Sequence, residues 1–174
     1  MLIIINGSYG VGKTTVSKKL LKVINNNQWV LLKSDCCWNE MVNKKPELAL
    51  GGTVTSSNSN FLKYYRCKIE NSLYEKNVII DLTINNDLAK KMIVDYFITN
   101  GIDVIVFIIK SSYEIVLERT KNDDREDEWL LKQYNDNERI INELFKDSVL
   151  IDTSNLTIDE TTNIIFDIIG KKTM

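Results

Sequence analysis

Short apolar runs alternate with longer amphipathic segments along the chain, and this alternation constrains the fold more than any other feature. The runs are almost continuously apolar and rich in β-branched residues, which is typical of strands buried on both faces of a sheet. They cover residues 2–6, 29–33, 77–81, 103–109 and 148–152. Apolar residues recur at helical spacing in 13–24, 61–75, 88–99, 113–120, 128–145 and 158–169. This order predicts an α/β fold, in which a five-stranded parallel sheet carries helices on both faces.

The length of 174 residues fits one domain, and the sequence contains no repeat and no linker. We therefore predict a single domain over residues 1–174. Residues 36–60 include the only proline and the loop-like segment GGTVTSSNSN, and we expect them to be an irregular or partly helical insertion above the sheet. Thr157 and Glu160 form the pattern of a capping box ahead of the last predicted helix.

The composition argues against several classes of function. The 22 Lys and Arg residues are scattered and are outnumbered by 24 acidic residues, so we expect no nucleic-acid partner. No uninterrupted apolar stretch approaches the roughly 18 residues that a membrane span needs. The apolar N-terminus turns polar after Ile5 and has no preceding basic residues, which is unlike a signal peptide. We expect a cytoplasmic protein without membrane contact.

The sequence contains no histidine, and this absence narrows the available chemistry. It removes histidine general bases, the common zinc sites and every Ser-His or Cys-His nucleophile. Cys36, Cys37 and Cys67 lack the spacing of metal ligands, and we expect them to be reduced thiols. Chemistry therefore has to depend on lysine, arginine, carboxylates, hydroxyls and backbone amides, a set that suits phosphoryl transfer.

The segment GSYGVGKTT connects the first predicted strand to the first predicted helix and fits the pattern G-x-x-x-x-G-K-[ST]. In this context the pattern indicates a phosphate-binding P-loop. Glycines let successive N–H groups turn inward around phosphate oxygens, and the N-terminus of the helix adds its positive dipole. Lys13 is expected to reach the β- and γ-phosphates, and Thr14 to ligate Mg²⁺. The motif predicts binding of ATP or GTP through nine consecutive residues: Gly7, Ser8, Tyr9, Gly10, Val11, Gly12, Lys13, Thr14 and Thr15.

Two aspartates follow predicted strands and are candidates for the acidic residue that assists Mg²⁺. Asp81 ends the run NVIID, and Asp35 lies just after WVLLK. The carboxyl ends of parallel strands border the crevice in which open α/β sheets bind ligands. We assign Asp35 to the metal, together with Thr14, and to the acceptor hydroxyl, whose proton it would take as a general base. We assign Asp81 to the acceptor site, and the sequence leaves open which of the two carries the acidic role.

The N-K-x-D and D-x-x-G elements of GTPases are absent. What remains resembles the small P-loop kinases, the group that holds shikimate kinase, gluconate kinase, nucleoside monophosphate kinases and chloramphenicol phosphotransferase. The resemblance spans nearly the full chain and depends on the P-loop, on Asp35, on LERTKNDDR at 117–125 and on VLIDTSNLTIDE at 149–160. The segment at 117–125 resembles the lid of that group, with its two arginines. Locally, a lid arginine combined with the pattern W-x-x-K-Q, which begins at Trp129, most resembles tunicamycin-resistance-type proteins. The resemblance implies a three-layer P-loop NTPase fold with strand order 2-3-1-4-5.

The same resemblance assigns roles to four arginines. Arg119 would lie near the adenine, and Arg125 would close on the transferring phosphoryl group. Arg66, in YYRCKIE, and Arg139 match the positions of two acceptor-binding arginines in shikimate kinase. An acceptor-binding insertion is expected at about 36–75, and a lid at about 120–128.

These observations predict an ATP-dependent phosphotransferase that moves the γ-phosphate to a hydroxyl of a small molecule, a metabolite or an antibiotic. The alternative is an ATP-binding resistance or regulatory protein that sequesters a ligand with little or no transfer. The sequence departs from shikimate kinase after the third strand, where DLTINND stands in place of a glycine triplet. The identity of the acceptor, the choice between ATP and GTP, and the choice between monomer and homodimer are therefore left open.

Overall fold

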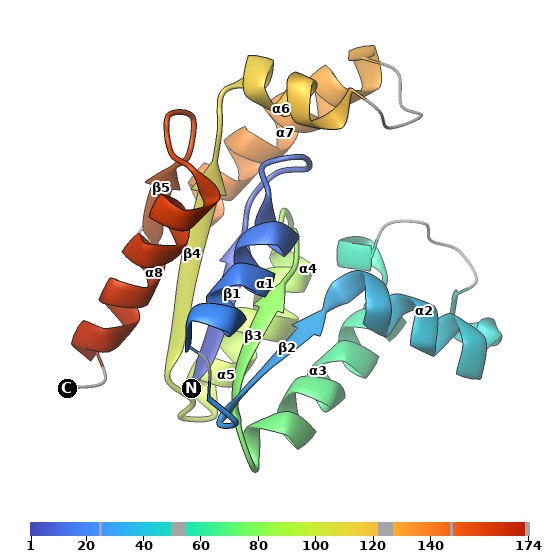
Figure 1. The fold of residues 1–174 in the computed structure, drawn as a ribbon. Coiled ribbons are helices and arrows are strands. Elements are labelled where there is room, and N and C mark those ends of the chain that lie inside the picture. The colour runs from blue at the N-terminus through green and yellow to red at the C-terminus, as the bar shows by residue number, and fades with distance from the viewer. Residues whose placement is uncertain (25, 50–54, 122–126, 147, 173–174) are drawn as a thin grey trace.

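The computed structural model describes residues 1–24, 26–49, 55–121, 127–146 and 148–172, and a parallel sheet runs through its centre (Figure 1). The sheet contains five strands: β1 (Leu2–Asn6), β2 (Trp29–Lys33), β3 (Asn77–Asp81), β4 (Val104–Lys110) and β5 (Val149–Asp152). Their order is β2-β3-β1-β4-β5, and all four neighbouring pairs are parallel. This order confirms the predicted fold class and strand order.

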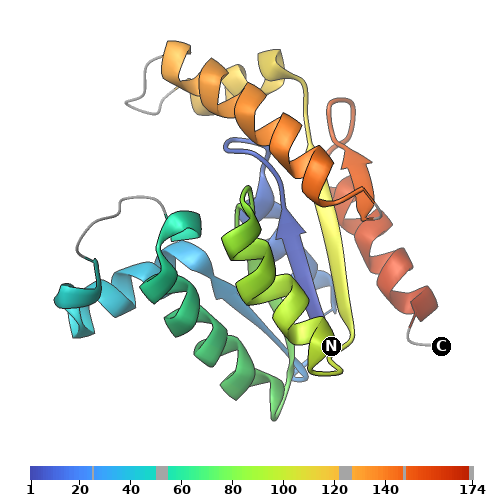
Figure 2. The ribbon, with the colours of Figure 1, turned by 180° about the vertical axis from the view of Figure 1, so that it is seen from behind.

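Helices cover both faces of the sheet (Figures 1 and 2). One face carries α1 (Lys13–Ile24) and α8 (Ile158–Lys172), which pack against each other. The other face carries α3 (Ser59–Leu73) and a second helical segment, made of α4 (Asp87–Ala89), the π-helical turn η3 (Lys90–Asp95) and α5 (Tyr96–Thr99). Helices α6 (Tyr113–Thr120) and α7 (Asp127–Leu144) form a hairpin beyond the carboxyl ends of the strands (Figure 1). In the described part of the chain, no helix combines the length and the apolar character that crossing a membrane requires.

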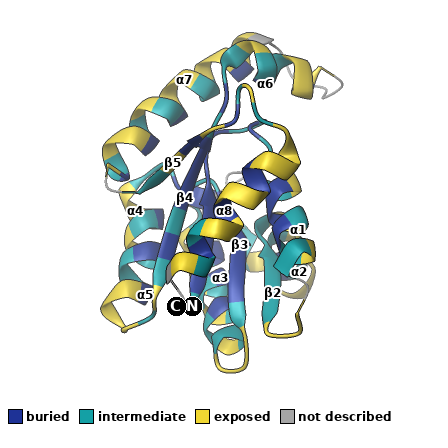
Figure 3. Cartoon of the chain, turned by 60° about the vertical axis from the view of Figure 1, so that its left-hand side comes forward, coloured by how far each residue is buried: buried dark blue, intermediate teal, exposed yellow. Residues whose placement is uncertain are grey.

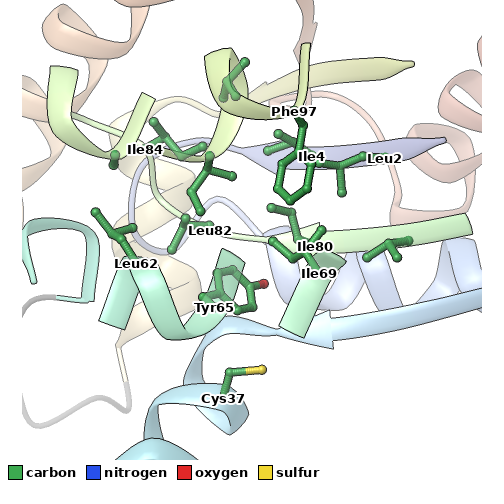
Figure 4. Packing of buried hydrophobic residues seen from close by; sticks show 14 of the residues in the cluster. Leu2, Ile4, Cys37, Leu62, Tyr65, Ile69, Ile80, Leu82, Ile84 and Phe97 are labelled. Atoms are coloured by element: carbon green, nitrogen blue, oxygen red, sulfur yellow. The ribbon is translucent and has the colours of Figure 1, made fainter. Parts of the chain in front are cut away.

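The strands supply two hydrophobic cores, one on each face, because successive side chains of a strand point to opposite sides. In β1, Leu2 and Ile4 belong to the core beneath α3, whereas Ile3 and Ile5 belong to the core beneath α1 and α8. Figure 3 shows the central strands as the most buried part of the molecule, and Figure 4 shows the packing of the α3 core. Each fully buried aliphatic side chain of this kind contributes roughly 1.5–3 kcal/mol.

Two segments are defined more closely by the structure than by the sequence. The segment predicted to be irregular or partly helical contains most of a regular helix, α2 (Ser34–Lys44), and two short 3-10 turns, η1 (Pro46–Ala49) and η2 (Thr55–Ser57). Residues 50–54 of the predicted insertion lie outside the described residues. The predicted helix over 88–99 contains the π-helical turn η3 and starts at Asp87, after the capping residue Asn86, whose side chain accepts a hydrogen bond from Ala89 N. The capping box is confirmed, because Thr157 N donates to Glu160 Oε2 and Glu160 N donates to Thr157 Oγ1.

Candidate nucleotide and acceptor site

A cleft of about 830 Å³ follows the carboxyl ends of the strands and is centred on the loop between β1 and α1. Because β1 is the middle strand, the residues after β2 and β3 line one side of this loop, and the residues after β5 line the other. We call the first side the β3 half, lined by Asp35, Ser56, Thr83, Asn85 and Asn137. The second is the β5 half, lined by Thr153, Leu156, Ile158 and Thr161. The volume lies within the range of ligand sites in proteins.

The loop of residues 7–12 has a backbone that requires glycine at two places in particular. Gly7 has a φ of 150°, and a Cβ atom at this residue would lie 2.2 Å from the carbonyl oxygen of Ile109 in β4. Gly10 has a φ of 79°, and its Cβ would lie 2.8 Å from Val116 Cγ1 in α6. The loop therefore fits tightly between β4 and α6, and no L side chain fits at Gly7 without a shift of backbone.

Gly7→Ala should destabilise the protein much more than Gly12→Ala. Gly12 also has a positive φ, of 98°, but the nearest atom to its Cβ would be Arg119 Nη1 at 3.9 Å. Gly12→Ala thus adds mainly backbone strain, worth roughly 1–3 kcal/mol, whereas Gly7→Ala adds a clash with backbone and should cost about 3 kcal/mol or more. Urea denaturation of both variants measures the difference. Equal free energies of unfolding would contradict the packing of Gly7 against β4.

Lys13 lies at the start of α1, and its Nζ donates a hydrogen bond of 2.8 Å to the carbonyl oxygen of Ser8, across the loop. Burial disfavours the charged ammonium and lowers the pKa of Lys13 to about 8, although the carboxylates of Asp81 and Asp35 act in the opposite direction. The side chain is therefore held over the loop, close to two acids and poorly solvated. A bound phosphate would supply negative charge at the same place.

Nucleotide affinity should fall as the pH rises through about 8. Free Lys13 loses its proton above its pKa of about 8, whereas phosphates bound beside it raise this pKa, so binding takes up a proton. The dissociation constant should then rise by up to about tenfold per pH unit. Calorimetry with ADP from about pH 7 to about pH 9.5 would measure this slope. Lys13→Arg, whose guanidinium keeps its charge at every one of these pH values, should bind with a flat profile. Parallel slopes in the two proteins would assign the proton to another group.

Asp81 and Asp35 both line the cleft, but their surroundings differ. Asp81 is buried at the end of β3, and its Oδ1 accepts a hydrogen bond of 3.0 Å from Ser34 N at the start of α2. Burial raises the pKa of Asp81, while an interaction with the hydroxyl of Thr14 and the Ser34 hydrogen bond oppose this rise. Asp35 is exposed in the first turn of α2. Asp81 is thus fixed by the fold, whereas Asp35 is accessible to a ligand.

The side chains around Thr14 offer the type of ligand atom that Mg²⁺ prefers. The hydroxyl of Thr14 and the carboxylates of Asp81 and Asp35 provide oxygen atoms, which Mg²⁺ prefers. Within the described ranges, no group of three or more acidic, cysteine or histidine side chains could hold a metal alone. A site with few protein ligands agrees with the usual coordination of Mg²⁺, which binds one or two protein carboxylates and completes its shell with phosphate oxygens and water.

Arg119 lies against the phosphate loop. Its Nη1 donates a hydrogen bond of 3.2 Å to the carbonyl oxygen of Val11, and the residue lines the cleft. The predicted lid arginine, Arg125, lies outside the described residues, as do residues 122–126 of the predicted lid. The lid boundaries and the role of Arg125 remain predictions.

Arg66 and Arg139 are not brought to the cleft, and their assignment to the acceptor site is not supported by this arrangement. Arg66 belongs to α3, and its guanidinium lies 4.2 Å from the ring centroid of Tyr96, the first residue of α5. Arg139 forms an exposed ion pair of 3.6 Å with Glu143 on its own helix. Neither arginine is among the described residues that line the cleft. The physical reason is that packing sets the direction of a helical side chain, and matching positions in sequence do not fix it.

Sequence reasoning missed several residues that shape the site. Asn6 is fully buried, and its Oδ1 accepts hydrogen bonds of 2.8 Å from both Gly7 N and Ile84 N, so it ties the phosphate loop to the loop after β3. Asn85 Nδ2 donates a hydrogen bond of 2.6 Å to Asn137 Oδ1 and connects that loop to α7. A polar residue at the end of an otherwise apolar strand was the available signal for Asn6, whereas Asn137 gave none.

Solved structures of similar fold include a tunicamycin resistance protein, a shikimate kinase and a gluconokinase. The tunicamycin resistance protein of Deinococcus radiodurans has a TM-score of 0.72 at 19% identity, covering 97% of this chain and 95% of that chain. Shikimate kinase from Acinetobacter baumannii, in complex with shikimate, has a TM-score of 0.66 at 18% identity, with coverages of 99% and 94%. A gluconokinase from Sinorhizobium meliloti 1021 has a TM-score of 0.60 at 15% identity, with coverages of 92% and 86%. At these identities the similarity shows the fold.

The family assignment comes from the sequence comparison. No curated protein sequence matches this chain significantly. The protein-family model described as AAA domain matches residues 3–143, which include the phosphate loop, four of the five strands and most of α7. The match covers well over half of the chain, and the P-loop NTPase fold agrees with it. The chain therefore belongs to this AAA domain family.

Proposed function

We propose that this protein is an ATP-dependent phosphotransferase that moves the γ-phosphate to a hydroxyl group of a small molecule. One observation carries the proposal: a single cleft joins a phosphate loop and its lysine to a half that is lined by an accessible aspartate and by uncharged polar side chains. A protein that only hydrolyses ATP has no need for such a second half. Phosphoryl transfer requires mainly positioning and charge neutralisation, which these residue types supply.

The nucleotide would bind with its phosphates on the loop and its base in the β5 half. The N–H groups at the start of α1 and the ammonium of Lys13 would hold the phosphates. Leu156 and Ile158 offer apolar contacts for a base, and the hydroxyls of Thr153 and Thr161 offer polar ones. Arg119, already beside Val11, would add a positive charge between the base and the phosphates.

The acceptor would bind in the β3 half, with its hydroxyl between Asp35 and the γ-phosphate. Its oxygen forms a bond to the γ-phosphorus, and the bond from that phosphorus to the bridging oxygen breaks. The electron pair of the broken bond stays on the β-phosphate of ADP, and the carboxylate of Asp35 takes the proton of the hydroxyl. When bound, Mg²⁺ supplies charge neutralisation at the β- and γ-phosphates. Asp81, held by Ser34 N, would keep the Thr14 hydroxyl oriented towards that ion.

Label transfer from γ-labelled ATP tests the proposal. The wild-type protein, incubated with Mg²⁺ and a small-molecule extract of the source cells, should give a labelled product other than inorganic phosphate. Lys13→Ala, treated in the same way, is the control for contaminating kinases. Tight retention of a small molecule with no labelled product would contradict transfer and favour the alternative, a nucleotide-binding protein that sequesters its ligand.

A further inference from the structure

We infer that the phosphoryl acceptor is an uncharged molecule whose hydroxyl or carbonyl oxygens accept hydrogen bonds, and that it carries no carboxylate or phosphate. The inference rests on the proposed function, because it concerns the β3 half of the same cleft. It is carried by the charges of that half and by the orientation of three asparagine amides.

The charges of the cleft are distributed unevenly. Among the described residues that line it, the only cations are Lys13 and Arg119, and both contact the phosphate loop. The β3 half contains the carboxylate of Asp35 and lies next to that of Asp81. The two arginines that would recognise an acidic acceptor are engaged elsewhere, Arg66 on Tyr96 and Arg139 on Glu143. A carboxylate placed here would lie beside Asp35 and Asp81, and the described cation next to them, Lys13, would be engaged with the phosphates of the nucleotide, so the field of this half disfavours an anion.

The orientation of the amides follows from one backbone N–H group. Ala89 N donates to Asn86 Oδ1, which leaves Asn86 Nδ2 to donate to Asn85 Oδ1 at 3.2 Å. Ser56 Oγ donates to the same oxygen at 3.1 Å, so Asn85 Nδ2 has to face Asn137. Asn137 Oδ1 is then the acceptor of the 2.6 Å bond. Each amide is fixed by the one before it.

This chain of bonds leaves donors over for a ligand. Asn137 is buried, with 5% of its surface exposed, and it lines the cleft. Its Nδ2 group has no hydrogen-bond acceptor among the described residues, and Asn85 Nδ2 has one N–H group left. The hydroxyl of Thr83, which lines the same half, is also available. Donors that line a cleft and have no protein acceptor can pair with the neutral oxygens of a ligand, whereas a ligand that excluded water without bringing such oxygens would leave them unpaired.

A neutral acceptor of this kind also suits the chemistry of Asp35. An uncharged alcohol brings no negative charge of its own, so neither the γ-phosphate nor the carboxylate of Asp35 repels it. The carboxylate can then lie close enough to take the hydroxyl proton. The amide donors would hold neighbouring oxygens of the acceptor and fix which hydroxyl faces the phosphorus. The β3 half therefore selects its substrate by hydrogen bonds rather than by ion pairs.

The test separates acceptors by charge without knowing their identity. A small-molecule extract of the source cells is passed over an anion-exchange resin, and the flow-through and the eluted anions are each incubated with γ-labelled ATP and protein. The label should enter a new product at least about tenfold faster with the flow-through. A product that forms mainly from the eluted anions would overturn the inference while supporting phosphotransferase activity.

Asn137→Asp provides a matched variant. Its carboxylate can still accept the hydrogen bond from Asn85 Nδ2, but it no longer offers the two N–H donors. We expect the kcat/KM for the flow-through acceptor to fall by about 30-fold and the KM for ATP to stay within about threefold, a split that a general loss of structure would not give. Asn135→Asp makes the same chemical change on the exposed face of α7 and should leave both parameters unchanged. An unchanged kcat/KM in Asn137→Asp would overturn the proposed role of the amides.

A second measurement covers the absence of transfer. If neither fraction yields a labelled product, the proposed function fails, and the binding step is tested by itself. Protein with a non-hydrolysable ATP analogue is equilibrated with the whole extract, washed by ultrafiltration and analysed by mass spectrometry. Retention of neutral compounds by the wild type and their loss in Asn137→Asp would support the inference. Retention of anions, equal retention by both proteins, or no retained compound would overturn it.

Discussion

Lys13→Ala should lower the kcat/KM for ATP by about 10³-fold while the protein stays folded. The Lys13 ammonium lies over the phosphate loop and is the one described lysine in the cleft. Removal of one preorganised charge or donor from a phosphate or oxyanion site typically costs about 2.7–4 kcal/mol of transition-state stabilisation. The free energy of unfolding should stay the same or rise, because burial disfavours this ammonium and lowers its pKa to about 8. Steady-state kinetics and urea denaturation measure the two effects.

Lys18→Ala is the matched control for this variant. Lys18 lies five residues further along α1 and is exposed, so its removal deletes the same charge without touching the cleft. We expect its kinetic parameters to stay within about twofold of those of the wild type. Equal turnover in Lys13→Ala and Lys18→Ala would show that the phosphate loop does not serve catalysis, and the proposed function would have to be abandoned.

The sheet could be read from the sequence because its central strands are buried on both faces and its edge strands are also apolar. The apolar runs at 2–6, 29–33 and 77–81 coincide with β1, β2 and β3 to the residue. The run at 103–109 is shifted by one residue from β4, and the run at 148–152 begins one residue before β5. A parallel sheet covered by helices leaves no solvent-facing side, so each strand is a short block of apolar residues with polar residues at its limits. Local composition therefore defines these elements.

The elements that sequence reasoning described poorly depend on contacts across the molecule. Helix α2 begins where Asp81 Oδ1, from β3, accepts a hydrogen bond from Ser34 N, a contact between residues 47 positions apart. The π-helical turn η3 lies in a segment with ordinary helical periodicity, and an inserted residue leaves no signal in that pattern. Such features are determined by packing.

The candidate site also has a part that local sequence predicts and a part that depends on long-range contacts. The phosphate loop lies in one continuous segment, so a local motif sufficed to find it. The β3 half draws Asp35, Ser56, Asn85 and Asn137 from four separate segments, and no local pattern connects them. Arg66 illustrates the limit of a position matched to a family motif, because its guanidinium lies over the ring of Tyr96 and the residue is not among the described residues that line the cleft. Side-chain direction is a tertiary property.

Asp35→Asn should reduce phosphoryl transfer by about 10²-fold or more and leave the dissociation constant of ATP within about threefold. Asp35 lines the cleft from the first turn of α2 and is exposed to ligand, so the amide removes the proton acceptor while it keeps the shape of the side chain. The loss should appear in the turnover number, because the proton moves in the transition state. Single-turnover transfer and calorimetry with an ATP analogue separate the two effects.

Asp81→Asn distinguishes the roles of the two aspartates, since it changes the same functional group in the same cleft. Its Oδ1 can still accept the hydrogen bond from Ser34 N, so the start of α2 should remain intact. Burial raises the pKa of Asp81, and a neutral amide avoids that desolvation cost, so stability should be unchanged or higher. We expect its main effect to be a higher Mg²⁺ concentration for half-maximal activity, with the turnover number at saturating Mg²⁺ reduced less than in Asp35→Asn.

If instead Asp35→Asn transfers at the normal rate and Asp81→Asn does not, the buried aspartate is the base and Asp35 is a surface carboxylate. The acceptor hydroxyl would then have to reach the buried carboxylate at the end of β3 rather than the exposed one at the start of α2.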